Sequence, residues 1–195
     1  MIKRSLHMFL ICFVFVNILK ASEYEITVLA TNTANFGGIG EWSFSALLES
    51  ENETILFDTG FDENTVLHNA KLLKKDLSRV EKVILSHFHG DHTGGLIKLR
   101  QTFMGDNPNA FSRVFVAEGF FDQRYDVDGN LRGFIGGFNE VSKFKKEAQE
   151  LGIEFTILRD SYEIADNLVV SGPVERNVEK VVVSPGFYLK ENGVL

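Results

Sequence analysis

Residues 87–95, His-Phe-His-Gly-Asp-His-Thr-Gly-Gly, decide the interpretation of this sequence. They contain three of the five histidines in the chain, together with one aspartate. A short apolar strand predicted over 83–85 leads into the segment, and its glycines allow a tight, irregular turn. Imidazole and carboxylate groups are ligands that zinc accepts. The segment is therefore predicted to bind metal through four side chains: His87, His89, Asp91 and His92.

Apolar patterning on both sides of this segment predicts strands with interposed helices. We expect strands over residues 25–30, 43–49, 54–57, 83–85, 114–117, 153–158 and 168–170. We expect helices over 62–75, 96–104 and 140–151, with Asp62 as a candidate cap of the first and Gly152 closing the last. This alternation predicts a layered α/β protein with a single domain.

Segment 87–95 resembles the H-x-H-x-D-H signature of the metallo-β-lactamase superfamily. Residues 56–60, Leu-Phe-Asp-Thr-Gly, resemble an earlier motif of that superfamily. Residues 40–49 resemble the branch that includes the dihydropterin ribofuranosyl-aminobenzene phosphate synthases. The resemblance implies an α/β fold of the αββα sandwich type.

The resemblance also implies a role for each residue of the cluster. His87 and His89 would hold a first metal ion and Asp91 with His92 would face a second, so zinc or another divalent metal is the expected cofactor. Water between the two ions would be acidified and would attack the substrate. Asp91 would also move a proton to the leaving group, which makes it the expected catalytic residue. Asp58 would accept hydrogen bonds that fix the motif loop.

The sequence departs from the superfamily pattern after His92, because no histidine follows it. The pattern has another histidine after the next strand, then a bridging aspartate and a final histidine. Where the first of these is expected, the chain reads Val-Phe-Val-Ala-Glu-Gly over 114–119, and Glu118 is a possible replacement ligand. Too little chain follows for the second half of the sandwich. We therefore expect a C-terminally shortened chain with that half incomplete.

Three hypotheses of function arise from these residues. The first is a hydrolase that uses a zinc-activated water on an ester-, lactone-, lactam- or phosphoester-like small molecule. The second is a catalytically inactive, shortened relative that binds at most one metal ion or a small ligand. The third and least favoured is an aspartic-protease-like enzyme built on Asp58-Thr59-Gly60, which would need a second copy of the triplet or a dimer.

Residues 1–22 have the layout of a secretory signal peptide. Lys3 and Arg4 precede an apolar run of 12 residues over 8–19, and Ala21-Ser22 ends the segment with small side chains. The run is too short for a stable membrane span, which needs ~20 apolar residues. The mature protein is therefore expected in the periplasm or outside the cell.

Residues 23–195 are expected to form the mature metallo-β-lactamase-like domain. Three of the chain's 20 basic residues lie in the leader and none of its 27 acidic residues does, which leaves 17 basic against 27 acidic residues, a net charge of −10. That charge disfavours nucleic acid and anionic membrane surfaces as partners, so a small-molecule substrate is expected. Because the single cysteine, Cys12, lies in the leader, the domain is expected to have no disulfide.

Expression of the full chain in a bacterium tests the leader. We expect the protein outside the cytoplasm with its N-terminus between Ala21 and Tyr24, because signal peptidase cuts after small residues. N-terminal sequencing of the purified protein is the measurement. A soluble cytoplasmic product that keeps Met1 or Ile2 would contradict the signal-peptide interpretation.

Overall fold

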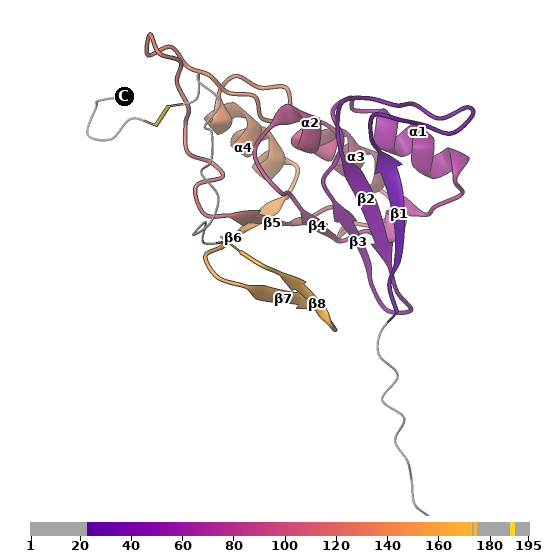
Figure 1. Cartoon of the computed structure of the whole chain (residues 1–195). Helices are drawn as coiled ribbons and strands as arrows, with labels where there is room; N and C mark the ends of the chain where they lie inside the picture. Colours follow the sequence, from indigo (N-terminus) through magenta and orange to yellow (C-terminus); the bar gives the residue numbers. More distant parts are fainter. Residues whose placement is uncertain (1–22, 173, 175–187, 190–195) are drawn as a thin grey trace, which may run out of the picture.

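A six-stranded sheet forms the centre of the fold (Figure 1). The computed structural model describes residues 23–172, 174 and 188–189, so the predicted leader lies outside the described part of the chain. The strands follow the order β1-β2-β3-β4-β5-β6, in which β1, β2 and β3 pair antiparallel and β3 to β6 pair parallel. They are β1 (Glu25–Ala30), β2 (Ser45–Glu49), β3 (Thr54–Phe57), β4 (Lys82–Ile84), β5 (Arg113–Ala117) and β6 (Glu154–Leu158).

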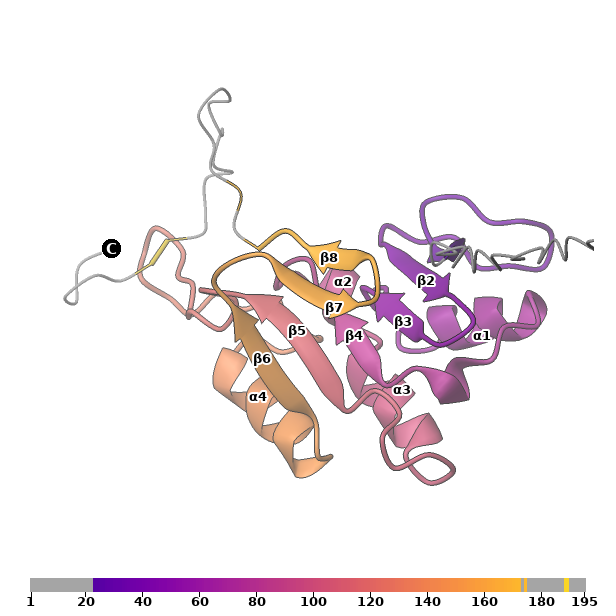
Figure 2. The ribbon, with the colours of Figure 1, turned by 90° about the horizontal axis from the view of Figure 1, so that it is seen from below.

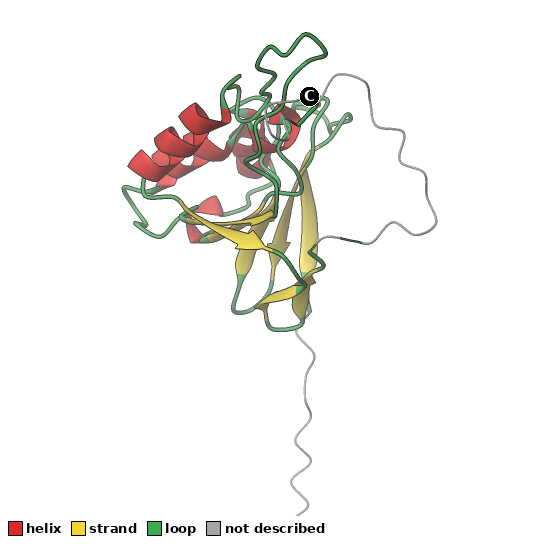
Figure 3. Cartoon of the chain, turned by 90° about the vertical axis from the view of Figure 1, so that its left-hand side faces the viewer, coloured by secondary structure: helices red, strands yellow, loops and turns green. Residues whose placement is uncertain are grey.

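Helices cover one face of this sheet, and a β-hairpin lies against the other face (Figures 1, 2 and 3). The helices are α1 (Thr65–Leu72), α2 (Gly90–Thr93), α3 (Leu96–Phe103) and α4 (Val141–Glu150), with a 3-10 turn at Leu77–Arg79. The hairpin consists of β7 (Tyr162–Ala165) and β8 (Leu168–Val170). Parallel neighbours require long crossover connections, and the helices occupy them. The α/β fold class is therefore confirmed.

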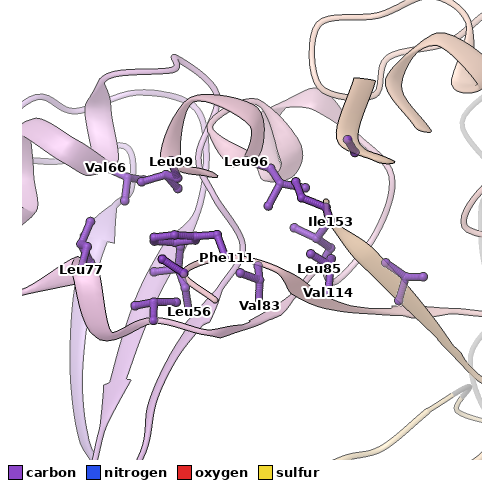
Figure 4. Close-up of a cluster of buried hydrophobic side chains, with 14 of the residues drawn as sticks. Leu56, Val66, Leu77, Val83, Leu85, Leu96, Leu99, Phe111, Val114 and Ile153 are labelled. Atoms are coloured by element: carbon purple, nitrogen blue, oxygen red, sulfur yellow. The ribbon is translucent and has the colours of Figure 1, made fainter. Parts of the chain in front are cut away.

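Two hydrophobic cores lie on opposite faces of the sheet. The core on the helix side includes the strand residues Leu56, Val83 and Val114 with Leu99 and Phe111 (Figure 4). The core on the hairpin side includes Ile55, Ile84 and Phe115 with Ile164. Because successive residues of a strand face opposite sides, neighbouring residues of β3, β4 and β5 enter different cores. This is why these strands are continuous apolar runs in the sequence.

All seven predicted strands and all three predicted helices are present, with ends that differ by at most three residues. The prediction that Asp62 caps the first helix is wrong: Asn64 occupies the cap position of α1, and Asp62 instead accepts a hydrogen bond from the Asn64 backbone nitrogen at 2.9 Å. Strand β7 was not predicted. Helix α2 replaces the expected irregular turn, since four residues are too few to show a helical pattern.

Replacement of Phe111 by alanine tests the core on the helix side. Phe111 is fully buried and stacks on Phe103 with ring centroids 5.7 Å apart. We expect Phe111→Ala to lower the free energy of unfolding by about 3–5 kcal/mol, because the cavity left behind adds to the lost transfer energy. Urea denaturation measures the loss. The control is Phe36→Ala, a fully exposed aromatic whose loss should cost less than about 0.5 kcal/mol; equal losses would contradict this description of the core.

Candidate metal centre

The predicted cluster lies where two parallel strands, β3 and β4, reach their carboxyl ends. Strand β3 ends at Phe57 and continues into Asp58, while β4 ends at Ile84 and continues toward His87. The register pairs Phe57 with Ile84, so the two motifs leave the sheet side by side. The carboxyl ends of parallel strands are the edge at which open α/β sheets bind ligands.

Backbone hydrogen bonds join the turn after β3 to the histidine motif. The Thr59 nitrogen donates to the carbonyl oxygen of His92 at 2.8 Å, and the Gly94 nitrogen donates to the carbonyl oxygen of Gly60 at 3.0 Å. A Cβ on Gly94 would overlap the carbonyl group of Phe61, so only glycine allows this close approach. The first motif therefore fixes the backbone of the second.

One hydrogen-bond network orients two of the histidines. Asp58 Oδ2 lies 2.7 Å from Nδ1 of His92 and accepts a hydrogen bond from Ser86 Oγ at 2.7 Å, and Oδ1 accepts from the Ser86 nitrogen at 2.7 Å. Because the Ser86 hydroxyl gives its proton to Asp58, it accepts from Nδ1 of His87, which lies 3.0 Å away. Both Nδ1 atoms are thereby assigned as donors. The lone pair on Nε2 of each imidazole is left for a metal ion.

Three side chains form a group that could hold a divalent metal ion: His87, Asp91 and His92. Their ligand atoms lie within 4.8 Å of one another, and the group is partly buried. Nε2 of His92, the nitrogen that the network leaves available, lies 3.6 Å from Oδ2 of Asp91. Two imidazoles and one carboxylate suit zinc, so the donor set fits the expected metal.

His89 lies beside this group, but its ring nitrogens are not among the grouped ligand atoms. Its ring centroid lies 4.8 Å from that of His87. The sequence-based expectation paired His87 with His89, and Asp91 with His92. The structure instead groups His87 with Asp91 and His92, because the network through Ser86 and Asp58 turns His87 and His92 toward each other.

Burial and neighbouring charges shift the pKa values of the three histidines in different directions. Burial lowers the pKa of His87, and repulsion from the other two histidines lowers it further. Burial likewise lowers the pKa of His89. Burial also opposes the charged form of His92, but the hydrogen bond to Asp58 and the negative charges of Asp58 and Asp91 outweigh it and raise the pKa of His92. His87 and His89 therefore favour the neutral form that binds metal.

Glu118, the possible replacement ligand, stays outside the group. Its carboxylate lies 3.1 Å from Nε of Arg159, and both side chains are exposed. The register of β5 and β6 pairs Ala117 with Leu158, so the residues that follow on the two strands are neighbours. The ion pair with Arg159 thus accounts for the position of Glu118.

The surroundings of Asp58 are those of a residue that orients a metal ligand. Only 1% of its side chain is exposed, and its carboxylate contacts His92 and Ser86. An aspartic protease instead needs two carboxylates that share a proton. The Asp-Thr-Gly triplet therefore belongs to the histidine cluster, which removes the basis of the aspartic-protease hypothesis.

Two polar residues that the sequence analysis did not single out support the site: Ser86 and Glu41. The carboxylate of Glu41 accepts hydrogen bonds from the backbone nitrogens of Phe61 and Asp62 at 2.7 and 3.0 Å, and from two nearby hydroxyl groups. It therefore fixes the loop that follows β3. Ser86 lies between an apolar strand and the first histidine of the motif, and this position in the sequence is a signal from which its supporting role could be predicted. Glu41 acts through a loop contact that no sequence pattern predicts.

The sequence profile of the metallo-beta-lactamase superfamily matches residues 43–105, which contain both motifs. The crystal structure of Tm1679, described as a metal-dependent hydrolase of the beta-lactamase superfamily, is similar with a TM-score of 0.61 and 29% sequence identity. That similarity covers 88% of this chain and 56% of Tm1679. The resemblance to the metallo-β-lactamase superfamily that the sequence predicts is therefore confirmed.

Two relatives from Methanocaldococcus jannaschii are similar over most of this chain. Uncharacterized protein MJ0448 is 30% identical over 154 residues, which are 79% of this chain and 55% of the relative. 7,8-Dihydropterin-6-methyl-4-(beta-D-ribofuranosyl)-aminobenzene-5'-phosphate synthase is 29% identical over 188 residues, which are 91% of this chain and 60% of the relative. The matches therefore span 55% and 60% of the lengths of these relatives.

Replacement of Asp58 by asparagine tests the network. Asparagine keeps the shape and tolerates the positive φ of 55° at this position, but it removes the negative charge that holds Nδ1 of His92. We expect Asp58→Asn to weaken zinc binding by about 10–100-fold, as is usual when a supporting hydrogen bond to a metal ligand is lost. A competition titration with a zinc chelator measures the affinity.

The matched control is Asp76→Asn, which alters a remote carboxylate that accepts a hydrogen bond from the Ser78 nitrogen. This variant should keep the original zinc affinity. If Asp58→Asn and Asp76→Asn bind zinc equally well, Asp58 does not orient a metal ligand.

Proposed function

We propose that this protein is a metal-dependent hydrolase of small molecules. One observation carries the proposal: His87, Asp91 and His92 bring their ligand atoms within 4.8 Å of one another at the carboxyl ends of parallel strands. The resemblance to the metallo-β-lactamase superfamily and similarity to a metal-dependent hydrolase support the same class of activity. The proposed substrates carry an ester-, lactone-, lactam- or phosphoester-like bond.

The side chains of the group have distinct proposed roles. His87 and His92 would bind the metal ion through Nε2, and Asp58 would keep His92 in the required tautomer and orientation. When bound, zinc or another divalent ion supplies Lewis acidity, which lowers the pKa of coordinated water and stabilises negative charge on oxygen. Asp91 borders both the group and an adjacent cavity, so its carboxylate can hold or move a proton at the leaving group.

We also propose that the protein works in the periplasm or outside the cell. This proposal depends on the leader over residues 1–22. Within the described residues, no helix is long and apolar enough to cross a membrane.

A second candidate is a catalytically inactive relative that binds one metal ion or a small ligand. The observation that favours it is the small number of ligands: three side chains form the group within the described residues, and Glu118 is paired with Arg159. Each missing ligand leaves a position for water and weakens the hold on an ion. Binding is therefore expected to be mononuclear or substoichiometric.

The double variant His87→Ala/His89→Ala tests the metal site. We expect it to reduce bound zinc to background, because two of the imidazoles of the cluster are lost. Elemental analysis of the purified full chain measures the zinc content. His68→Ala is the matched control, since His68 contacts the carbonyl oxygen of Gly37 outside the group. Unchanged zinc in the double variant would show that the cluster is not the site.

Turnover separates the two candidates. The hydrolase proposal expects zinc-dependent cleavage of at least one of four substrate types, ester, lactone, lactam or phosphoester, and loss of that cleavage in Asp91→Asn. Zinc binding without turnover on any of the four would favour the inactive relative.

A further inference from the structure

A cavity of about 560 Å³ opens beside the candidate metal centre. Three aromatic residues line it, Trp42, Phe61 and Phe134, and we call it the aromatic cavity. His89 and Asp91 line the side next to the metal-binding group. The volume is within the range of small-molecule sites, which combine apolar walls with a few polar groups.

The aromatic side chains converge from three distant segments. Trp42 precedes β2, Phe61 follows β3, and Phe134 lies between β5 and α4. Their exposed fractions are 78%, 50% and 47%. Phe61 and Phe134 stack with ring centroids 6.1 Å apart and an interplanar angle of 20°. Exposed aromatic surface gathered at one hollow, instead of scattered, marks a surface that binds something apolar.

Hydrogen bonds close to the metal site hold the loops that carry two of these aromatic residues, Phe61 and Phe134. Glu41 holds the loop of Phe61 through the backbone nitrogen of that residue, at 2.7 Å. The loop of Phe134 is anchored by the fully buried Ile135 and by the Gly136 nitrogen, which donates to Thr93 Oγ1 of helix α2 at 2.8 Å. The loops of Phe61 and Phe134 are therefore held in place before a ligand arrives, which lowers the entropic cost of binding.

Arg132 contributes a guanidinium group to the lining of the aromatic cavity, which also contains the carboxylate of Asp91. Arg132 lines the cavity in the same loop as Phe134. A guanidinium group is a strong hydrogen-bond donor to carboxylates and phosphates. Aromatic side chains stack on the faces of other rings, and arginine binds anions. The cavity therefore suits a ligand that has both an aromatic ring and an anionic group.

We propose that the aromatic cavity binds the non-reacting part of the substrate, a flat aromatic ring with an anionic substituent directed at Arg132. The inference rests on the proposed function in one respect: the bond to be cleaved would lie at the group that contains Asp91. Binding of the ring depends on Trp42, Phe61 and Phe134 and can be measured without turnover.

Fluorescence of the full-length protein tests the ring directly, because Trp42 is the only tryptophan in the chain. The probe is phenylphosphonate, whose carbon–phosphorus bond resists hydrolysis. We expect a saturable shift of the emission to shorter wavelength as the ring covers the exposed indole. Methylphosphonate, which has the anion without the ring, should bind at least about tenfold more weakly, since it lacks the ring contacts. Equal binding of the two phosphonates would overturn the proposal.

Two variants test the ring contacts. Phe134→Ala should weaken phenylphosphonate binding by roughly tenfold and leave methylphosphonate binding unchanged. Phe61→Leu provides a second test, with a smaller change in volume. Phe36→Ala is the control, since Phe36 is exposed and does not line the cavity. If Phe134→Ala and Phe61→Leu, each verified as folded by its unfolding curve, bind like Phe36→Ala, the aromatic cavity is not the site.

Arg132→Gln tests the anionic substituent. It should weaken phenylphosphonate roughly tenfold and leave benzyl alcohol, which has the ring without the anion, unchanged. Equal effects on both probes would overturn the role of Arg132.

Loss of zinc in His87→Ala/His89→Ala tests the proposed function alone, whereas the contrast between the two phosphonates tests the aromatic cavity. Failure of one proposal can therefore be told from failure of the other.

Discussion

The contact between the carboxylate of Asp58 and Nδ1 of His92, 2.7 Å long, is the interaction on which the site depends. Asp58 is almost completely buried, and a buried charge is costly unless it is paired and hydrogen-bonded. Its partners, Ser86 and His92, come from the segment after β4, so they reach it only if β3 and β4 are adjacent and parallel in the observed register. The fold and the histidine cluster therefore depend on each other.

Helix α2 connects the metal site to the aromatic cavity. It carries Asp91 and His92, and its Thr93 accepts a hydrogen bond from the backbone of the loop that contains Phe134. The loop of Phe61 is held by Glu41, which accepts a hydrogen bond from the Phe61 backbone nitrogen. A substrate whose ring lies against these aromatic side chains would carry its reactive bond toward Asp91. The same short helix would thus position both the metal ligands and the loop that contacts the ring of the substrate.

Local patterns in the sequence predicted most of the fold and the location of the site. Residues 54–57 and 83–85 are largely apolar runs, which predicts strands with both faces buried, as the two cores show. The histidine spacing after the second strand indicates a metal cluster. The grouping of His87 with Asp91 and His92 was not predictable, since it depends on side-chain contacts across two strands. The ion pair that holds Glu118 depends in the same way on the register of β5 and β6.

The tautomers of the His87 and His92 imidazoles show whether the Asp58 network orients the metal ligands. The network requires Nδ1 of both His87 and His92 to carry a proton, so that Nε2 faces the metal ion. Long-range proton–nitrogen NMR correlations of the histidine rings distinguish the two nitrogens. In the zinc-loaded protein we expect protonated Nδ1 and metal-bound Nε2 in His87 and His92, with loss of this pattern at His92 in Asp58→Asn. A protonated Nε2 in either ring of the zinc-loaded original protein would contradict this assignment.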